Sequence, residues 1–148
     1  MILNTTSILS RVLTAFLFVA LMAVGTQAQT MKGQWKLVEM TVEGARFDLT
    51  ADRTPTLIFG EESRVSGDAG CNRYSTTYDL NNKKVIDFKP FISTKMACTE
   101  QKRSSQEVKY FVAFDKVNKF KMSKKLLTFT DKNKKNVLKF VPLETATE

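Results

Sequence analysis

Short apolar segments separated by turn residues recur along this chain, and they constrain its fold more than any other feature. Residues 34–40 alternate apolar and polar side chains, which is typical of a strand with one buried face. Further short segments occupy 56–59, 64–67, 74–80, 83–88, 126–130 and 137–141. Asn81-Asn82 and the charged stretch 131–135 separate neighbouring segments as hairpin turns would. The pattern predicts a mainly β, β-rich α+β domain with a strongly curved antiparallel sheet or small barrel.

One segment has helical rather than strand periodicity. Ser104-Ser105-Gln106-Glu107 fits a capping box, in which a serine and a glutamate satisfy each other's backbone amides. Behind it, apolar residues follow helical spacing and form a broad stripe: Val108, Tyr110, Phe111, Val112, Phe114 and Val117. We therefore expect one helix over about 105–117, lying on the sheet, with its aromatic residues in the core.

The first residues read as a targeting segment. Arg11 precedes an apolar run at 12–24, small and polar residues follow, and no acid occurs before Gln29. This order is typical of a secretory signal peptide, so we expect cleavage after Ala28 and a single domain over 29–148. The alternative is an uncleaved anchor, but the run is shorter than the roughly 20 residues that a spanning helix needs. No cysteine lies near the cut, which predicts an exported protein, periplasmic or extracellular, without a lipid anchor.

Two cysteines, Cys71 and Cys98, remain in the expected mature domain. In an exported chain such a pair is first interpreted as a disulfide. Closing a loop of this length would stabilise the fold by roughly 3.5 kcal/mol on the loop-entropy model. Two buried free thiols and a reactive redox pair are the open alternatives, although no Cys-x-x-Cys motif is present.

The expected mature domain is basic. The net charge is +8, and residues 1–28 hold one basic and no acidic residue, so 29–148 carry +7. A basic exterior favours anionic partners such as lipid head groups or envelope polymers. The lysines also cluster at expected turns, at 83–84, 124–125 and 132–135, where they would aid solubility and block edge pairing. We favour this second interpretation, and secretion argues against a nucleic-acid partner.

The middle of the chain resembles a known family. Its residues 67–74 read GDAGCNRY, and after a hairpin residues 94–98 read TKMAC. This pair, in this order, is similar to the signature of the META domain, also called the HslJ-like family, and the likeness extends over about 31–142. The resemblance implies a compact antiparallel β domain with one helix and lipocalin-like strand topology. It also implies export, association with the cell envelope and a role in stress tolerance; the missing lipidation cysteine argues against membrane tethering.

The residue types available exclude most catalytic chemistry. The chain has no histidine, which rules out Ser-His-Asp and Cys-His catalysis and histidine metal sites. No phosphate-binding glycine loop is present, and no acidic pair is placed for glycoside chemistry. We therefore expect no enzyme activity, no metal and no cofactor, and we expect a monomer.

Asn72, Arg73 and Tyr74 are the residues best suited to recognition, because they combine amide, guanidinium and phenol groups. The structural alternative is that Asn72 bonds a turn, Arg73 pairs with an acid such as Asp68, and Tyr74 covers the core. Two functions follow: an envelope-associated stress or interaction module, or a carrier of a small apolar ligand in the barrel. A third is an inhibitor of secreted proteases, for which 91–95 is the candidate loop.

Overall fold

The computed structural model describes residues 31–81 and 84–143, and the expected signal peptide lies outside them. The strands are β1 (Gly33–Val42), β2 (Ala45–Phe47), β3 (Thr56–Phe59), β4 (Arg64–Asp68), β5 (Arg73–Leu80), β6 (Ile86–Phe88), β7 (Ile92–Ser93), β8 (Lys119–Met122), β9 (Leu127–Thr130) and β10 (Val137–Pro142). Within the described ranges there is one helix, α2 (Gln101–Lys116). None of the residues described forms a helix long and apolar enough to cross a membrane.

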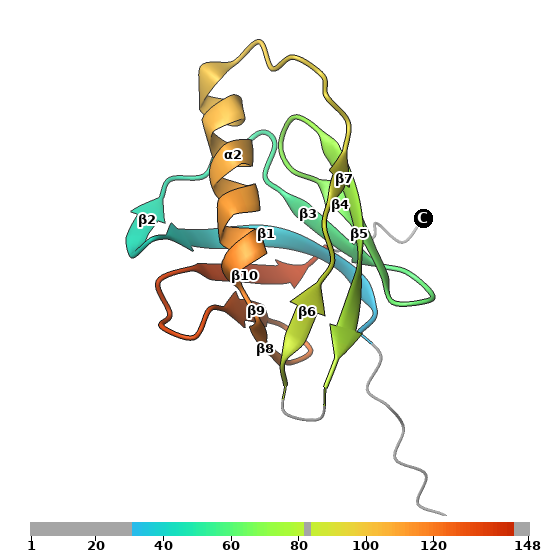
Figure 1. Ribbon diagram of the computed structural model, residues 1–148. Helices are drawn as coiled ribbons and strands as arrows, with labels where there is room; N and C mark the ends of the chain where they lie inside the picture. Colours follow the sequence, from blue (N-terminus) through green and yellow to red (C-terminus); the bar gives the residue numbers. More distant parts are fainter. Residues whose placement is uncertain (1–30, 82–83, 144–148) are drawn as a thin grey trace, which may run out of the picture. The chain divides into compact units, whose positions relative to one another are not determined.

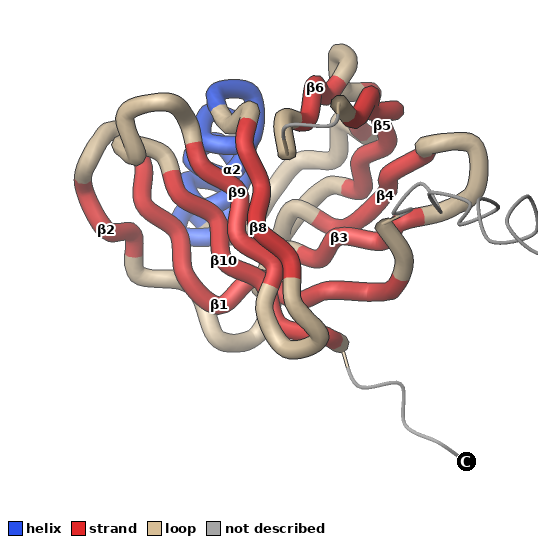
Figure 2. The backbone as a smooth tube through the Cα atoms, turned by 90° about the horizontal axis from the view of Figure 1, so that it is seen from below, coloured by secondary structure: helices blue, strands red, loops and turns tan. Residues whose placement is uncertain are grey.

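The strands form one antiparallel, barrel-like sheet that is nearly closed. Its order is β6-β5-β4-β3-β1-β10-β9-β8, with β2 added beside β1 and β7 beside β5 (Figures 1 and 2). The two ends of this order meet where Val85 bridges Lys119. There the Ile86 N–H donates to the Asn118 carbonyl (3.0 Å) and the Phe120 N–H to the Lys84 carbonyl (3.1 Å). The curved sheet expected from the sequence is confirmed.

The central strand β1 contains a bulge. Its pairing with β10 slips between Leu37 and Glu39, so Val38 is the extra residue and is 44% exposed. Leu37 before the bulge and Met40 after it are both fully buried. A simple alternation would have turned Met40 outward, because side chains change face at every residue. The bulge lets one long strand bury Trp35 and Leu37 before it and Met40 and Val42 after it.

Both hairpins expected from the sequence are present. β5 pairs antiparallel with β6, and β9 pairs with β10 around the lysine-rich loop, as predicted. Sequence analysis missed β2, β7 and β8. The first two are only three and two residues long. β8 has the sequence KFKM, and its two apolar side chains are only half-buried.

The start of α2 differs from the prediction. The helix begins at Gln101 with Glu100 as its N-cap, which makes no side-chain capping bond, so the capping box at 104–107 is wrong. Gln106 is instead fully buried. Its Oε1 accepts from the Thr50 N–H (2.7 Å), and its Nε2 donates to the Arg53 carbonyl (2.8 Å). The buried face of the helix therefore contains a polar side chain, that of Gln106, whereas the sequence pattern predicted only apolar residues there.

The interior is filled with side chains, many of them aromatic. Tyr110, Phe114, Phe129 and Phe140 are all fully buried. Phe88 and Phe114 are in contact with ring centroids 4.4 Å apart and their planes tilted. Phe114 of the helix also contacts Phe91 and Phe129. The expected packing of the helical aromatics is thus confirmed. Val108, placed on the same stripe by the prediction, is 58% exposed, because the buried face runs through Gln106, Tyr110 and Ala113 instead.

Candidate functional site

The two cysteines join the β4–β5 turn to the segment before α2. Cys71 and Cys98 form a disulfide with their Cα atoms 5.9 Å apart, and both residues are half-buried. The pair therefore lies at the distance that the sequence interpretation requires. Since Cys98 lies three residues before the helix begins, the bridge anchors that connecting segment at one end.

Asn72 fixes the same segment through its side chain. It is 6% exposed, and its Oδ1 accepts from the Met96 N–H (2.8 Å) and the Thr94 hydroxyl (2.9 Å). Its Nδ2 donates to Glu107 on α2 (2.7 Å) and to the Met96 carbonyl (3.3 Å). The Asn72 N–H also donates to Glu107 (2.5 Å). One buried amide thus connects the turn, the segment and the helix. Asn72 has a structural role, but its side chain bonds distant residues and not, as the structural alternative expected, the backbone of a turn.

Tyr74 lies in the core, which agrees with the structural role considered for it as an alternative to recognition. Only 3% of it is exposed, and its hydroxyl donates to the Thr56 carbonyl (2.9 Å) and lies 2.7 Å from the Tyr110 hydroxyl. Burial raises the pKa of Tyr74 above its ordinary value. Gly67 permits this arrangement, because a Cβ there would clash with the Thr56 carbonyl and crowd the Tyr74 ring. Neither Asn72 nor Tyr74 therefore offers its side chain to a partner.

Residues 92–97, here called the braced segment, are held at both ends yet face outward. Ile92 is 77% exposed and Met96 59% exposed, the highest values among large apolar side chains in the part of the chain described. β7 pairs with β5, and the Thr94 N–H donates to the Arg73 carbonyl (3.0 Å). Arg73 is exposed beside it and forms no ion pair within 31–81 and 84–143; the expected partner Asp68 pairs with Arg53 instead (3.2 Å). Arg73 is thus the member of the predicted trio available for recognition.

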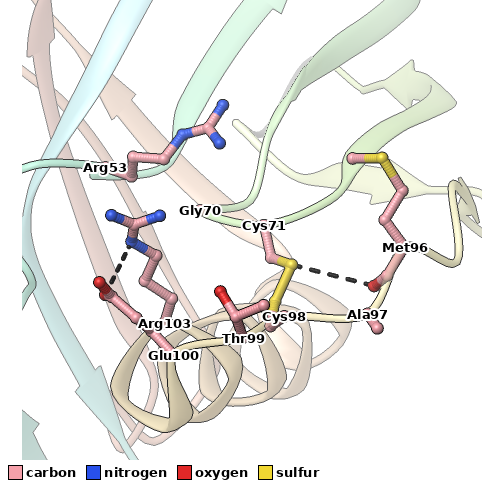
Figure 3. A pocket seen from close by; sticks show the side chains of 9 residues that line it. All are labelled: Arg53, Gly70, Cys71, Met96, Ala97, Cys98, Thr99, Glu100 and Arg103. Carbon is pink, nitrogen blue, oxygen red and sulfur yellow. Dashed lines mark hydrogen bonds and ion pairs between the residues drawn. A yellow bond between two sulfur atoms is a disulfide. The ribbon is translucent and has the colours of Figure 1, made fainter.

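A shallow cavity of about 190 Å³ lies beside the disulfide (Figure 3). Its lining consists of Arg53, Gly70, Cys71, Met96, Ala97, Cys98, Thr99, Glu100 and Arg103. Acids already pair with both arginines: Arg103 with Glu100 (3.0 Å) and Asp52, and Arg53 with Asp68. The Arg103 guanidinium that donates to Asp52 lowers the pKa of that carboxyl. Since ligand pockets usually measure about 300–1,000 Å³, this hollow is small for a metabolite.

The chain can now be compared with known proteins. The model of the family described as META domain matches residues 28–144. The chain belongs to the META domain family. No curated protein matches it.

Solved structures share the fold of this META domain. A protein from Burkholderia xenovorans, solved by NMR, superimposes with a TM-score of 0.63 at 20% identity, over 78% of this chain and 85% of that one. A DUF4847 family protein from Bacteroides vulgatus gives a TM-score of 0.58 at 12% identity, over 82% and 99% of the two chains. A third structure, also from NMR, gives 0.55 at 19% identity, over 77% and 92%. These likenesses concern the fold alone.

The META domain also brings Glu107 close to the disulfide, which sequence analysis missed. The sulfurs of Cys71 and Cys98 and a Glu107 oxygen lie within 4.8 Å of one another. While the sulfurs are bonded to each other they offer no thiolate ligands, because only the thiolate binds metal strongly. Glu107 was assigned to the helix cap; its bonds to Asn72 cross 35 residues of sequence, and no local pattern reports such a contact.

Proposed function

We propose that this META domain is a non-catalytic, exported interaction module that binds a protein partner through the braced segment and Arg73. The observation that carries the proposal is the exposure of Ile92 and Met96 on backbone that the fold itself immobilises. Exposed apolar side chains rimmed by polar groups are typical of protein interfaces. A segment that is already ordered loses little conformational entropy on binding, so its contacts translate into affinity. Lys95 and Arg73 add charge at the rim.

The interior argues against the alternative, a carrier of a small apolar ligand. A carrier needs an open apolar cavity of several hundred Å³. In this domain Tyr110, Phe114 and Phe129 occupy the space between the helix and the sheet, and all three are fully buried. The proposal therefore places binding on the outer surface.

Export, envelope association and a stress role are parts of this proposal. The disulfide supports export, because such bonds persist mainly in oxidising compartments. The remaining two parts come from the family resemblance. Intact mass of the protein recovered from its native cells would test export: a chain beginning at Gln29 and lighter by two hydrogens than its reduced form is expected. A full-length, reduced chain would overturn this part of the proposal.

Site-specific photo-crosslinking tests the binding surface. A photo-reactive residue at Ile92 or Met96 is expected to capture one discrete protein partner in the native cell. Val108, which is equally exposed but lies on α2, is the matched control position. Equal capture from Val108 would contradict the proposal, and so would no capture from Ile92 and Met96. Native mass spectrometry of the same protein addresses the carrier: a stoichiometric small-molecule adduct lost on denaturation would replace our proposal with that function.

One observation favours a second candidate, the inhibition of a secreted protease. Inhibitory loops are exposed, extended and preorganised, and they change little on binding. The braced segment has these properties over 92–97, with Lys95 at its centre, whereas Phe91 is half-buried against Phe114 (ring centroids 5.0 Å apart). The loop expected at 91–95 is thus shifted by about one residue. Titration of a trypsin-like protease would show stoichiometric inhibition that Lys95→Ala abolishes; rapid cleavage after Lys95 without inhibition would exclude this function.

A further inference from the structure

A second surface, remote in sequence from the braced segment, carries a cluster of positive charges. Residues 119–130, here called the basic hairpin, comprise β8, β9 and the loop between them. They include Lys119, Lys121, Lys124 and Lys125, and no acidic residue occurs between Asp115 and Asp131. Among the described ranges, none of these four lysines takes part in an ion pair. Their positive charge is therefore not neutralised by the fold.

Lysines elsewhere in the domain show the contrast. Lys89 contacts both Asp79 and Asp87 (2.7 Å each). Lys139 pairs with Glu39 across β10 and β1 (2.9 Å), and this pair marks the edge of the basic area, because Lys139 lies opposite Thr128 of β9. The four hairpin lysines thus differ from Lys89 and Lys139, whose charge is neutralised by neighbouring acids.

The strand register places the charges in a row on the outer face. Lys119 lies opposite Thr130 and Lys121 opposite Thr128, while Phe120 faces the buried Phe129 on the inner side. Residues two apart on a strand are about 6.8 Å apart, so the two lysines follow each other at that spacing. Between them and the β8–β9 loop lies a groove of about 370 Å³, to which Ser123, Leu126, Thr128 and Thr130 contribute.

We propose that the basic hairpin binds a linear, phosphate-bearing polymer along this groove. Each lysine ammonium offers up to three donors to phosphate oxygens, and the threonine hydroxyls offer further donors. Two lysines that follow each other along β8, with two more in the adjoining loop, can contact several anions of one chain, whereas a single small anion would contact only part of them. Binding would release counterions from the polymer and would weaken steeply with salt.

Protection of a sheet edge does not account for this cluster. β8 ends the strand order, and charged residues commonly guard such edges. Near Lys119, however, that edge is already paired, because the Phe120 N–H donates to the Lys84 carbonyl. Lys124 and Lys125 lie outside β8, in the loop.

The chemistry of the groove favours a polymer over a membrane or a nucleic acid. Membrane-binding surfaces insert exposed apolar side chains, and in this hairpin Leu126, at 40% exposure, is the large apolar residue that is substantially exposed. Phe120 and Met122 are half-buried on the inner side. Single-stranded nucleic acids are held largely by bases stacked on aromatic rings. In the hairpin Phe129 is fully buried, and Phe120, which contributes to the groove lining, is half-buried.

Fluorescence anisotropy with labelled inorganic polyphosphate tests this inference. We expect Lys119→Gln/Lys121→Gln/Lys124→Gln to weaken binding at least about 10-fold and to reduce the salt slope by about 2. Lys132→Gln/Lys134→Gln/Lys135→Gln is the matched control, because it removes the same charge from the neighbouring β9–β10 loop; less than about a 2-fold change is expected. Thermal melting of both variants checks that each is folded.

Three results would overturn the inference. Equal weakening by both triple variants would show attraction by net charge alone. No binding of polyphosphate by the wild-type protein at low salt would exclude the site. Tighter binding to vesicles of anionic phospholipid than to polyphosphate, lost in the same variant, would assign the hairpin to a membrane surface instead.

Discussion

The braced segment and the basic hairpin are both exposed, but different kinds of contact hold them in place. Thr94 and Met96 are held through backbone and side-chain bonds to Arg73 and Asn72, and a disulfide follows at Cys98. Lys124 and Lys125 lie in a loop closed by local bonds, in which the Ser123 hydroxyl accepts from nearby N–H groups. The braced segment is fixed by contacts from distant parts of the chain, whereas the loop that carries Lys124 and Lys125 is closed by bonds within its own turn.

This difference separates two kinds of recognition. A fixed apolar segment presents one geometry, and it suits a partner that is itself structured. A set of long cationic side chains on a short hairpin adapts its positions, and it suits a repetitive anionic partner. Substitutions in the fixed region should therefore affect stability more than substitutions in the charged one.

Removal of the disulfide should have the largest effect. Cys71→Ser/Cys98→Ser is expected to lower the free energy of unfolding by about 3.5 kcal/mol, because the unfolded chain regains the entropy of an open loop. Urea denaturation of the oxidised protein and of the variant measures this difference. Hydrogen exchange at the Phe129 amide in the buried core should accelerate only as far as global stability falls, whereas the Met96 amide should in addition exchange through local opening of the braced segment. Equal acceleration at both amides would show that the two regions are not independent.

Loss of the Asn72 side chain should come next. Asn72→Ala removes the donor to Glu107 and the acceptor of the Met96 N–H, and we expect destabilisation by about 2.5 kcal/mol. Asn133→Ala, in the exposed β9–β10 loop, serves as the control and should change stability by less than about 0.5 kcal/mol. Similar values for the two variants in urea denaturation would show that Asn72 does not brace the segment.

Alkaline pH should act on the core behind the braced segment. Burial raises the pKa of Tyr74 and of Tyr110 above their usual range, whereas in the unfolded chain they ionise near about 10. The stability that these two protonated phenols contribute is complete below about pH 10. It is lost as the pH rises further, because the phenols then release their protons in the unfolded chain but not in the folded one. Stability should fall by about 1.4 kcal/mol per buried tyrosine for each pH unit above that value. Absorbance at 295 nm checks this, and ionisation of both phenols near pH 10 in the folded protein would contradict it.

Neutralising the basic hairpin should have the smallest effect on folding. Lys119→Gln/Lys121→Gln/Lys124→Gln is expected to raise stability by about 0.5 kcal/mol at low salt, because it relieves repulsion between exposed charges. The gain should vanish at about 0.5 M salt, where such charges are screened. Thermal melting at the two salt concentrations measures both values. A loss of stability at either concentration would show that these lysines have structural roles.

The sequence reveals the fold better than the site, for a physical reason. Alternation in 34–40 and the hairpin between 126–130 and 137–141 depend on neighbours in the chain, so they are visible without a structure. The bulge at Val38 and the burial of Gln106 depend on partners far away in sequence, and local periodicity misplaces both. The two-residue strand β7 has no periodicity at all.

The same distinction applies to the candidate site. The cysteine pair was predicted from composition and compartment, and the structure places it at bonding distance. Asn72, Arg73 and Tyr74 are consecutive, yet strand β5 turns Arg73 outward and leaves its two neighbours buried. Ile92 lies in the loop 91–95 that the sequence analysis proposed for an inhibitor, whereas Met96 was not singled out, because no local pattern marks an exposed apolar side chain.

The pairing of β1 with β10 has a consequence for how the chain reaches its native state. The first strand of the sheet hydrogen-bonds with the last, across nearly the whole length of the domain. Contacts between distant residues slow folding, because a long loop must close before they form. A ribosome delivers residues 137–142 after the other strands of the sheet, so the middle of the sheet stays open until β10 has been synthesised. In an incomplete chain the edge of β1 that pairs with β10 is therefore exposed and accessible to chaperones. The sheet is completed only when β10 is available to pair.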